Sequence, residues 1–269
     1  MARQMFHDLS GHCMSLHIDS IGSGEPLLLL HGWGMHGGVW SEVAQKLAES
    51  HRVHSIDLPG YGFSRDENAP TLDAIVSVLA ACFAEPIAVC GWSLGGQVAM
   101  HWAAREPDKV RRLVLVASTP CFAAREDWPC GMGSEALGKF AEELELNHAA
   151  TLRRFIALQL RGSENERELL AVLRERLFSR GESDKDALRA GLAILRDIDQ
   201  RSGLKDIRQP ALVICGERDK LTPPEASRYL AHALPAARYI EVAGAAHAPF
   251  LSHPDFFVEQ MKSFLHERI

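Results

Sequence analysis

The chain has 269 residues and a formal net charge of −6, with 46% hydrophobic and 24% charged residues. This length and composition are typical of one globular α/β domain that carries an insertion, and they allow a sizeable core without disulfides. The negative net charge argues against nucleic acid as a partner.

The first residues, the length of the apolar runs and the cysteines lead us to expect a soluble cytoplasmic protein. The first residues, MARQMFHDLSGHCMSL, include no apolar segment typical of a secretory signal, and PLLLL is too short to span a membrane. None of the six cysteines forms a C-x-x-C pair, and several lie in apolar runs such as IAVC and LVIC. We therefore expect free buried thiols. No pair of His or Cys has zinc spacing, so we expect no metal and no cofactor.

Short apolar runs alternate with helical patterns along most of the chain. The runs lack polar alternation, as do strands of a parallel sheet that is covered on both faces. Strand alternating with helix predicts a doubly wound, mostly parallel sheet. An earlier segment, 13–24, does alternate and predicts an antiparallel edge hairpin. The predicted strands are 26–32, 52–60, 86–93, 111–118, 210–219 and 237–244, and the helices between them are 40–50, 71–83, 95–107 and 223–234.

One long segment interrupts this alternation. From Thr119 to about Arg208 no strand is predicted, and four helical patterns follow one another instead. We interpret this segment as a helical cap, at 120–208, inserted between late strands of a core formed by 1–119 and 209–269. The predicted cap helices are 133–146, 149–160, 165–178 and 184–198.

The stretch GWSLG, centred on Ser93, matches the pattern G-x-S-x-G. The match alone is weak, but Ser93 follows the predicted strand IAVC and precedes a predicted helix. That context is the strand–turn–helix of a nucleophile elbow, in which the serine lies in a tight, strained turn. Side chains at Gly91 and Gly95 would clash in such a turn. An ordinary helix N-cap would explain the serine but not the flanking glycines.

A serine nucleophile needs a base and an acid, which in this architecture follow in the order serine, carboxylate, histidine. Asp219 follows the strand ALVIC and is the favoured acid, with Glu217 as its local rival. His247 lies in a loop of small residues after the last strand and is the candidate base. We expect His253 to be structural and His31 to support the loop that follows it.

The oxyanion of an acyl intermediate needs two backbone N–H donors. One is expected from Leu94, the residue after the nucleophile. The other is expected from the loop LLLLHGWGM, where Trp33 is the candidate. These two donors fit an acyl tetrahedral intermediate, and a serine rather than an aspartate at the elbow favours ester or thioester chemistry.

Several motifs together resemble one family closely. They are LLLLHGWGMHGGVW, IDLPGYGFS, GWSLGGQVA, VASTPCFAAREDWP, FIALQ and AAHAPFLSHP. The chain resembles the pimeloyl-acyl carrier protein methyl ester carboxylesterases of biotin synthesis, which have the α/β-hydrolase fold. The resemblance covers almost the whole chain, and the motifs within the insertion are those that single out this family.

The resemblance implies an activity and a set of site residues. The family removes the methyl group from the distal carboxyl of a pimeloyl thioester on acyl carrier protein, which stops further chain elongation. It implies catalysis by Ser93, Asp219 and His247. It also implies that substrate contacts come from Trp33, Ser93, Leu94, Phe155, Ile156, Ala157, Leu158, Gln159 and His247.

The family binds its acidic carrier protein through arginines on the cap. Arg154 and Arg167 stand at matching positions, whereas Ala150 and Ala171 replace two further family arginines. We expect Arg153 and Arg161 to contribute in their place. Residues 151–180 contain seven arginines and four glutamates, which fits either a solvated helical face or a surface that attracts an acidic partner.

Alternative functions remain open from the sequence. One is a general short-chain carboxylesterase or other serine hydrolase that acts on free small esters, and acyl transfer to an acceptor other than water is a variant of it. Another is a ligand receptor on the same fold, although a receptor would not need a complete serine, aspartate and histidine. We expect a monomer that acts without nucleic acid or membrane.

Overall fold

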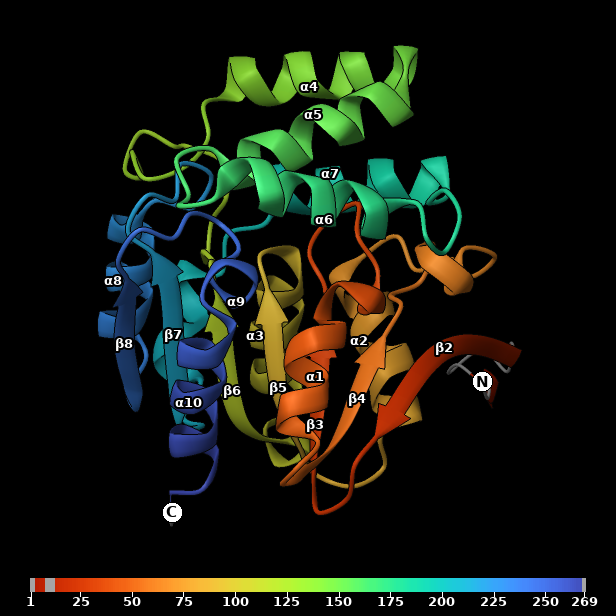
Figure 1. Cartoon of the computed structure of the whole chain (residues 1–269), viewed down its shortest axis with the longest axis vertical. Helices are drawn as coiled ribbons and strands as arrows, with labels where there is room; N and C mark the ends of the chain where they lie inside the picture. The colour runs from red at the N-terminus through yellow and green to blue at the C-terminus, as the bar shows by residue number, and fades with distance from the viewer. Residues whose placement is uncertain (1–2, 8–12, 268–269) are drawn as a thin grey trace.

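The computed structural model describes residues 3–7 and 13–267, and the side chains from residue 16 onward (Figure 1). Eight strands in this part of the chain form one sheet in the order β1-β2-β4-β3-β5-β6-β7-β8. β2 pairs antiparallel with β1 and β4, and the six strands from β4 to β8 in this order are parallel. The strands are β1 Arg3–His7, β2 Cys13–Ile21, β3 Glu25–Leu30, β4 His51–Ile56, β5 Ile87–Trp92, β6 Val110–Val116, β7 Ala211–Gly216 and β8 Ala237–Val242.

The predicted architecture is confirmed. Each predicted apolar run forms a parallel strand, and the alternating segment forms the antiparallel β2 beside β1. Every residue of β5 and β7 is buried, because helices cover both faces of the sheet. In Figure 1, α1 and α10 pack together in front of the sheet, and α3 lies behind it.

Four helices of the core, α2, α8, α9 and α10, begin at residues suited to helix N-termini. The Thr71 side chain accepts a hydrogen bond from the N–H of Ala74 at the start of α2, and α8, α9 and α10 each have proline in the first turn. The helices are α1 Ser41–Leu47, α2 Leu72–Cys82, α3 Leu94–Arg105, α8 Pro224–Ala233, α9 Pro249–Ser252 and α10 Pro254–Leu265, with 3₁₀ helices at Gly37–Trp40, Gly62–Ser64, Pro107–Lys109 and Arg201–Asp206.

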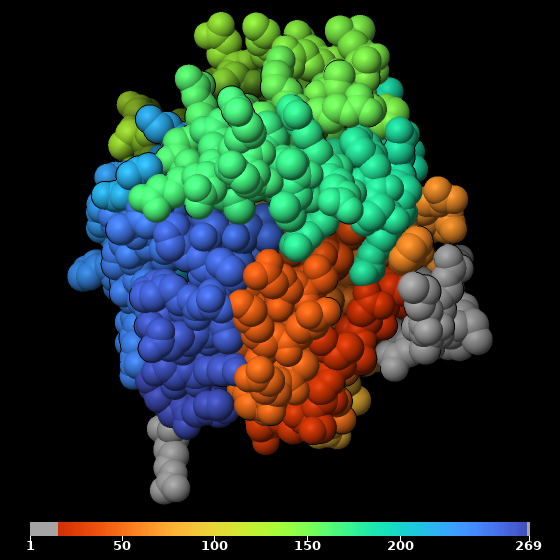
Figure 2. Space-filling model, in the orientation of Figure 1, coloured from red at the N-terminus to blue at the C-terminus, as the bar shows by residue number. Residues whose placement is uncertain are grey.

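Four helices lie between β6 and β7 in the sequence and above the sheet in space (Figures 1 and 2). They are α4 Ser134–Leu146, α5 His148–Leu160, α6 Glu166–Leu177 and α7 Lys185–Asp197, at the predicted places. No strand forms between residues 119 and 208, all of which are described. We call these four helices the cap; the exact division at 119/120 and 208/209 stays a prediction.

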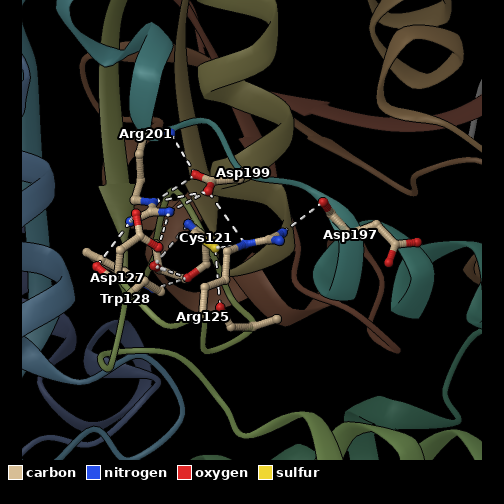
Figure 3. Close-up of polar contacts among 9 residues, drawn as sticks. Cys121, Arg125, Asp127, Trp128, Asp197, Asp199 and Arg201 are labelled. Carbon is tan, nitrogen blue, oxygen red and sulfur yellow. Dashed lines mark hydrogen bonds and ion pairs between the residues drawn. The ribbon is translucent and has the colours of Figure 1, made fainter.

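The two segments that join the cap to the core are tied together (Figure 3). Cys121, on the way into the cap, forms an antiparallel bridge with Asp199, on the way out. Arg201 bonds the carboxylates of Asp199 and Asp127, at 2.7 and 3.1 Å, and its guanidinium lies over the Trp128 ring. The segment VASTPCFAAREDWP, residues 116–129, therefore forms the base of the cap.

A buried ion pair links the far side of the cap to the core. The Asp57 carboxylate, which is fully buried, accepts the N–H of Gly37 at 2.7 Å and of Phe63 at 2.8 Å. Arg180, between α6 and α7, donates to Asp57 at 2.9 Å and also pairs with Asp19. One side chain of the cap thus neutralises a carboxylate that orders two loops of the core.

We predict that Arg180→Met lowers the free energy of unfolding by about 3 kcal/mol, because it leaves the Asp57 charge buried without a cation. Adding Asp57→Asn should restore part of that loss, since the asparagine is neutral. Urea unfolding of the two single variants and the double variant measures the coupling. Strictly additive losses would contradict a direct ion pair.

Candidate functional site

Ser93 occupies a strained turn between β5 and α3. Its φ of 55° and ψ of −114° are unusual for a residue with a side chain. Its N–H donates to the carbonyl of Val116 at 2.9 Å, which fixes the turn against β6. The Ser93 side chain makes no capping hydrogen bond to α3, so the interpretation as an N-cap does not account for this serine.

Glycines make this turn possible. A Cβ on Gly91 would lie 2.2 Å from the carbonyl oxygen of Gly95, across the turn. A Cβ on Gly95 would lie 2.5 Å from the carbonyl oxygen of Leu30, at the end of β3. The predicted clash is therefore confirmed at both positions, with a neighbouring strand as the obstacle at Gly95.

Asp219 and His247 meet through a buried hydrogen bond. His247 Nδ1 lies 2.8 Å from Asp219 Oδ2, and both side chains are at most 1% exposed. Asp219 Oδ1 also accepts the N–H groups of Leu221 and Thr222, at 2.9 and 3.0 Å. With the carboxylate held in this way, Nδ1 carries the proton and Nε2 is left with a free lone pair.

The position of His247 is fixed by both the core and the cap. Its carbonyl accepts the indole N–H of Trp92, the residue before Ser93, at 2.8 Å. Its N–H donates to the carbonyl of Gln159 in α5, at 3.0 Å. His247 Nε2 is buried and has no hydrogen-bond partner among the described residues. The loop that contains His247 therefore lies beside the elbow, and Nε2 of His247 makes no hydrogen bond there.

Thr222 is a site residue that the sequence analysis missed. Its hydroxyl donates to Asp219 Oδ2 at 2.8 Å and lies 3.3 Å from His247 Nδ1. The spacing D-x-x-T, typical of an aspartate that accepts N–H bonds from the residues after it, could have indicated this contact.

The rival residues have other partners. Glu217 accepts the N–H of Gly244 at 2.9 Å, and His253 Nδ1 contacts the Ser252 hydroxyl at 2.9 Å. Cys90 precedes the elbow, but burial raises the pKa of its thiol far above the usual range, so it is a poor nucleophile.

The loop after β3 lies against the elbow. A Cβ added to Gly32 would lie 3.4 Å from the Cβ of Ser93. Leu94 is the first residue of α3, where a helix leaves the N–H without an intrahelical acceptor. None of the hydrogen bonds of the described residues uses the backbone N–H of Trp33 or Leu94. Both predicted oxyanion donors thus remain free, close to Ser93 in sequence or in space.

His31 supports this loop, as predicted. Its Nε2 accepts the N–H of Leu58 at 3.0 Å, so its Nδ1 donates to the carbonyl of Gly32 at 2.8 Å. Burial lowers the pKa of His31 to about 4, which keeps the ring neutral and preserves both bonds at neutral pH.

Comparisons with known proteins decide the family. A family model described as the alpha/beta hydrolase fold matches residues 25–254. A pimeloyl-acyl carrier protein methyl ester esterase of Nitrosomonas europaea is 46% identical over 245 residues, which are 91% of this chain and 97% of that one. The enzyme of the same name from Chromobacterium violaceum is 43% identical over 94% and 98% of the two chains.

The chain belongs to the pimeloyl-acyl carrier protein methyl ester esterases of the α/β-hydrolase family. It is therefore a carboxylic ester hydrolase. Among solved structures, an esterase from Exiguobacterium antarcticum superposes with a TM-score of 0.89 over 99% of this chain and 100% of that one. The sequence identity is 21%, so this likeness shows the fold alone.

An apolar cavity of about 280 Å³, which we call the inner cavity, is lined by residues of the cap region of this esterase and by Trp33 of the loop after β3. The Trp33 ring lies 5.0 Å from the Phe155 ring and 5.4 Å from the Phe140 ring. The Trp33 indole N–H donates to the carbonyl of Leu188 in α7, at 2.8 Å. The cavity is lined by Trp33, Phe122, Met132, Ala136, Leu137, Lys139, Phe140, Arg154, Phe155, Leu158, Leu192 and Leu195.

The five predicted substrate contacts on α5 divide into two groups. Phe155 and Leu158 line the inner cavity. Ile156 and Gln159 are buried away from it, and Ala157 is half-buried. Ile156 packs in the hydrophobic core, as one face of a cap helix must, whereas Gln159 supports His247 through its carbonyl. Substrate contact at these positions stays a prediction.

The predicted docking arginines have different surroundings. Arg154 pairs with Glu143 and also lines the inner cavity, so it stands at the rim of that cavity. Arg153 lies over the Phe178 ring at 5.0 Å. Arg161 and Arg167 are exposed. Of the four predicted docking arginines, only Arg154 lines the inner cavity.

The structure also bears on the cysteines, on membrane-spanning helices and on metal ligands. The described cysteine side chains, those of Cys82, Cys90, Cys121, Cys130 and Cys215, are free thiols, as predicted; the side chain of Cys13 lies outside the described part. In that part, no helix is long and apolar enough to cross a membrane. No three His, Cys, Asp or Glu side chains of the described residues gather as metal ligands.

We predict that Asp219→Asn lowers kcat by about 10⁴-fold, because an amide would favour the wrong histidine tautomer. Glu217→Gln is the matched control: it changes a carboxylate two residues away but keeps an acceptor for Gly244. It should change kcat only a few-fold. Steady-state hydrolysis of p-nitrophenyl acetate compares them, and equal losses in both variants would overturn the assignment of Asp219.

Proposed function

We propose that this esterase hydrolyses the methyl ester of pimeloyl-acyl carrier protein to pimeloyl-acyl carrier protein and methanol, in biotin synthesis. The observation that carries the proposal is the 46% identity to an esterase of that name, which extends over the cap as well as the core. Similarity in the core alone would support only hydrolase chemistry. Similarity in the cap bears on the substrate, because a carrier-linked substrate must pass the cap to reach Ser93.

In the proposed reaction, His247 Nε2 takes the Ser93 proton as Ser93 attacks the ester carbonyl. The N–H groups of Trp33 and Leu94 stabilise the oxyanion, and His247 then protonates methanol as it leaves. Water activated by the same nitrogen releases the acyl group from Ser93. Asp219 orients His247 and stabilises its charged form. The buried, unpartnered Nε2 supports this role.

The inner cavity supports an apolar acyl chain as the substrate. The aromatic rings of Trp33, Phe140 and Phe155 form much of its wall. We infer that the pimeloyl chain lies there, with the ester at Ser93 and the carrier protein outside, beyond Arg154. The partner is therefore an acyl carrier protein, and we expect the esterase to act as a cytoplasmic monomer.

The alternatives differ from this proposal in their substrates. A general short-chain carboxylesterase would act as well on free esters, and a ligand receptor would have no use for the buried pair of Asp219 and His247. The family to which the chain belongs disfavours both.

The test compares kcat/KM for methyl pimeloyl-acyl carrier protein with kcat/KM for free dimethyl pimelate. We expect the carrier-linked ester to be preferred at least tenfold, and Ser93→Ala to lose about 10⁴-fold or more on both. Complementation of a biotin auxotroph that lacks this esterase gives the cellular readout. Equal kcat/KM for the two esters, without complementation, would favour a general esterase.

For carrier docking, we predict that Arg154→Glu with Arg167→Glu lowers kcat/KM for the carrier-linked ester about tenfold, because rim charges steer association with an acidic partner. The loss should shrink as salt rises, and hydrolysis of a free short ester should stay unchanged. Lys205→Glu with Arg208→Glu, which reverses two exposed cations outside the four cap helices, is the matched double charge-reversal control. A salt-insensitive, unchanged kcat/KM in the double variant would reject the docking surface.

A further inference from the structure

The cap contains a second cavity that shares a wall with the inner one. It has a volume of about 290 Å³ and lies between α4 and α7; we call it the outer cavity. Two residues line both cavities: Leu137 of α4 and Leu192 of α7. We call these two side chains the leucine partition. The outer cavity is lined by Leu137, Gly138, Ala141, Leu144, Glu145, Arg189, Leu192, Ala193 and Arg196.

The two leucine side chains are buried, and the residues next to them in the sequence are small. Leu137 is 3% exposed and Leu192 is 7% exposed. Their neighbours in sequence, Gly138 and Ala193, also line the outer cavity but have minimal side chains. A Cβ added to Gly138 would meet nothing within 4 Å. Shortening either leucine would therefore remove side-chain atoms from the wall that the two cavities share.

The partition also limits the direction in which an acyl chain can run. A chain in the inner cavity is in reach of Trp33, of aromatic walls from Phe140 and Phe155, and of the two leucines. The polar part of the lining is Lys139 and Arg154, where a carrier-linked chain could leave. A free chain too long for the inner cavity gains no further burial once it meets the partition.

We propose that Leu137 and Leu192 set the longest acyl chain that this esterase accepts in its inner cavity. The inference rests on the proposed function in one respect, that the acyl chain of the substrate lies in that cavity. It assigns to the leucine partition a selective role beyond the packing of α4 against α7.

The experiment measures kcat/KM for a series of free straight-chain methyl esters, from butanoate to dodecanoate. For the wild type, kcat/KM should rise with chain length and then fall. In Leu192→Ala and Leu137→Ala, the fall should move to longer chains, with a gain of about tenfold or more for the longest ester relative to the shortest. Leu192→Phe, which adds bulk to the shared wall, should not extend the profile toward longer chains.

Leu144→Ala is the matched control. Leu144 is 1% exposed on α4 and lines only the outer cavity of the two, so its loss enlarges that cavity and leaves the partition in place. Its profile should match that of the wild type. Because removal of a buried leucine is destabilising, Leu192→Val and Leu137→Val provide milder versions whose folding is checked by thermal melting.

The outcomes separate this inference from the proposed function. Folded partition variants with the wild-type profile, or a Leu144→Ala profile shifted as far as theirs, would overturn the role of the partition. Wild-type turnover of methyl pimeloyl-acyl carrier protein is measured alongside. Failure there would reject the proposed function, whereas the length shift with free esters is scored independently of it.

Discussion

The strained backbone of Ser93 is the constraint on which the rest of the site depends. A residue with a φ of 55° persists only where its surroundings hold it, and here β6 binds its N–H while β3 closes against Gly95. The strands can approach this closely because glycine occupies the positions where a Cβ would collide. The same close approach brings the loop after β3 beside the serine, where the oxyanion donors are expected.

The cap takes part in the site as well as covering it. Gln159, in α5, holds the backbone of His247, while Trp92 holds it from the core. Trp33 connects the same two parts, because its ring lines the inner cavity and its indole N–H binds the carbonyl of Leu188 in α7. A movement of the cap would therefore displace both the catalytic base, His247, and the loop after β3 that contains Trp33.

Contacts join the cap region to the core at two separate places. Cys121 and Asp199 hold the two connecting segments together, and Arg180 binds Asp57 on the opposite side. Arg180 and Asp199 lie before and after α7 in the sequence, and α7 carries Leu192 of the leucine partition.

The sequence by itself determined the order of the elements, the elbow at Ser93 and the candidates Asp219 and His247, because strand periodicity, glycine placement and chain order are local signals. It could not determine which side chains meet across long separations. Asp57 and Arg180 are 123 residues apart, and Thr222 joins His247 only because β7 and β8 are neighbours. Phe155 and Ile156 looked equally suited to the substrate passage. Only the packing of α5 decided that Phe155 faces the cavity and Ile156 the core, since adjacent residues of a helix point in different directions.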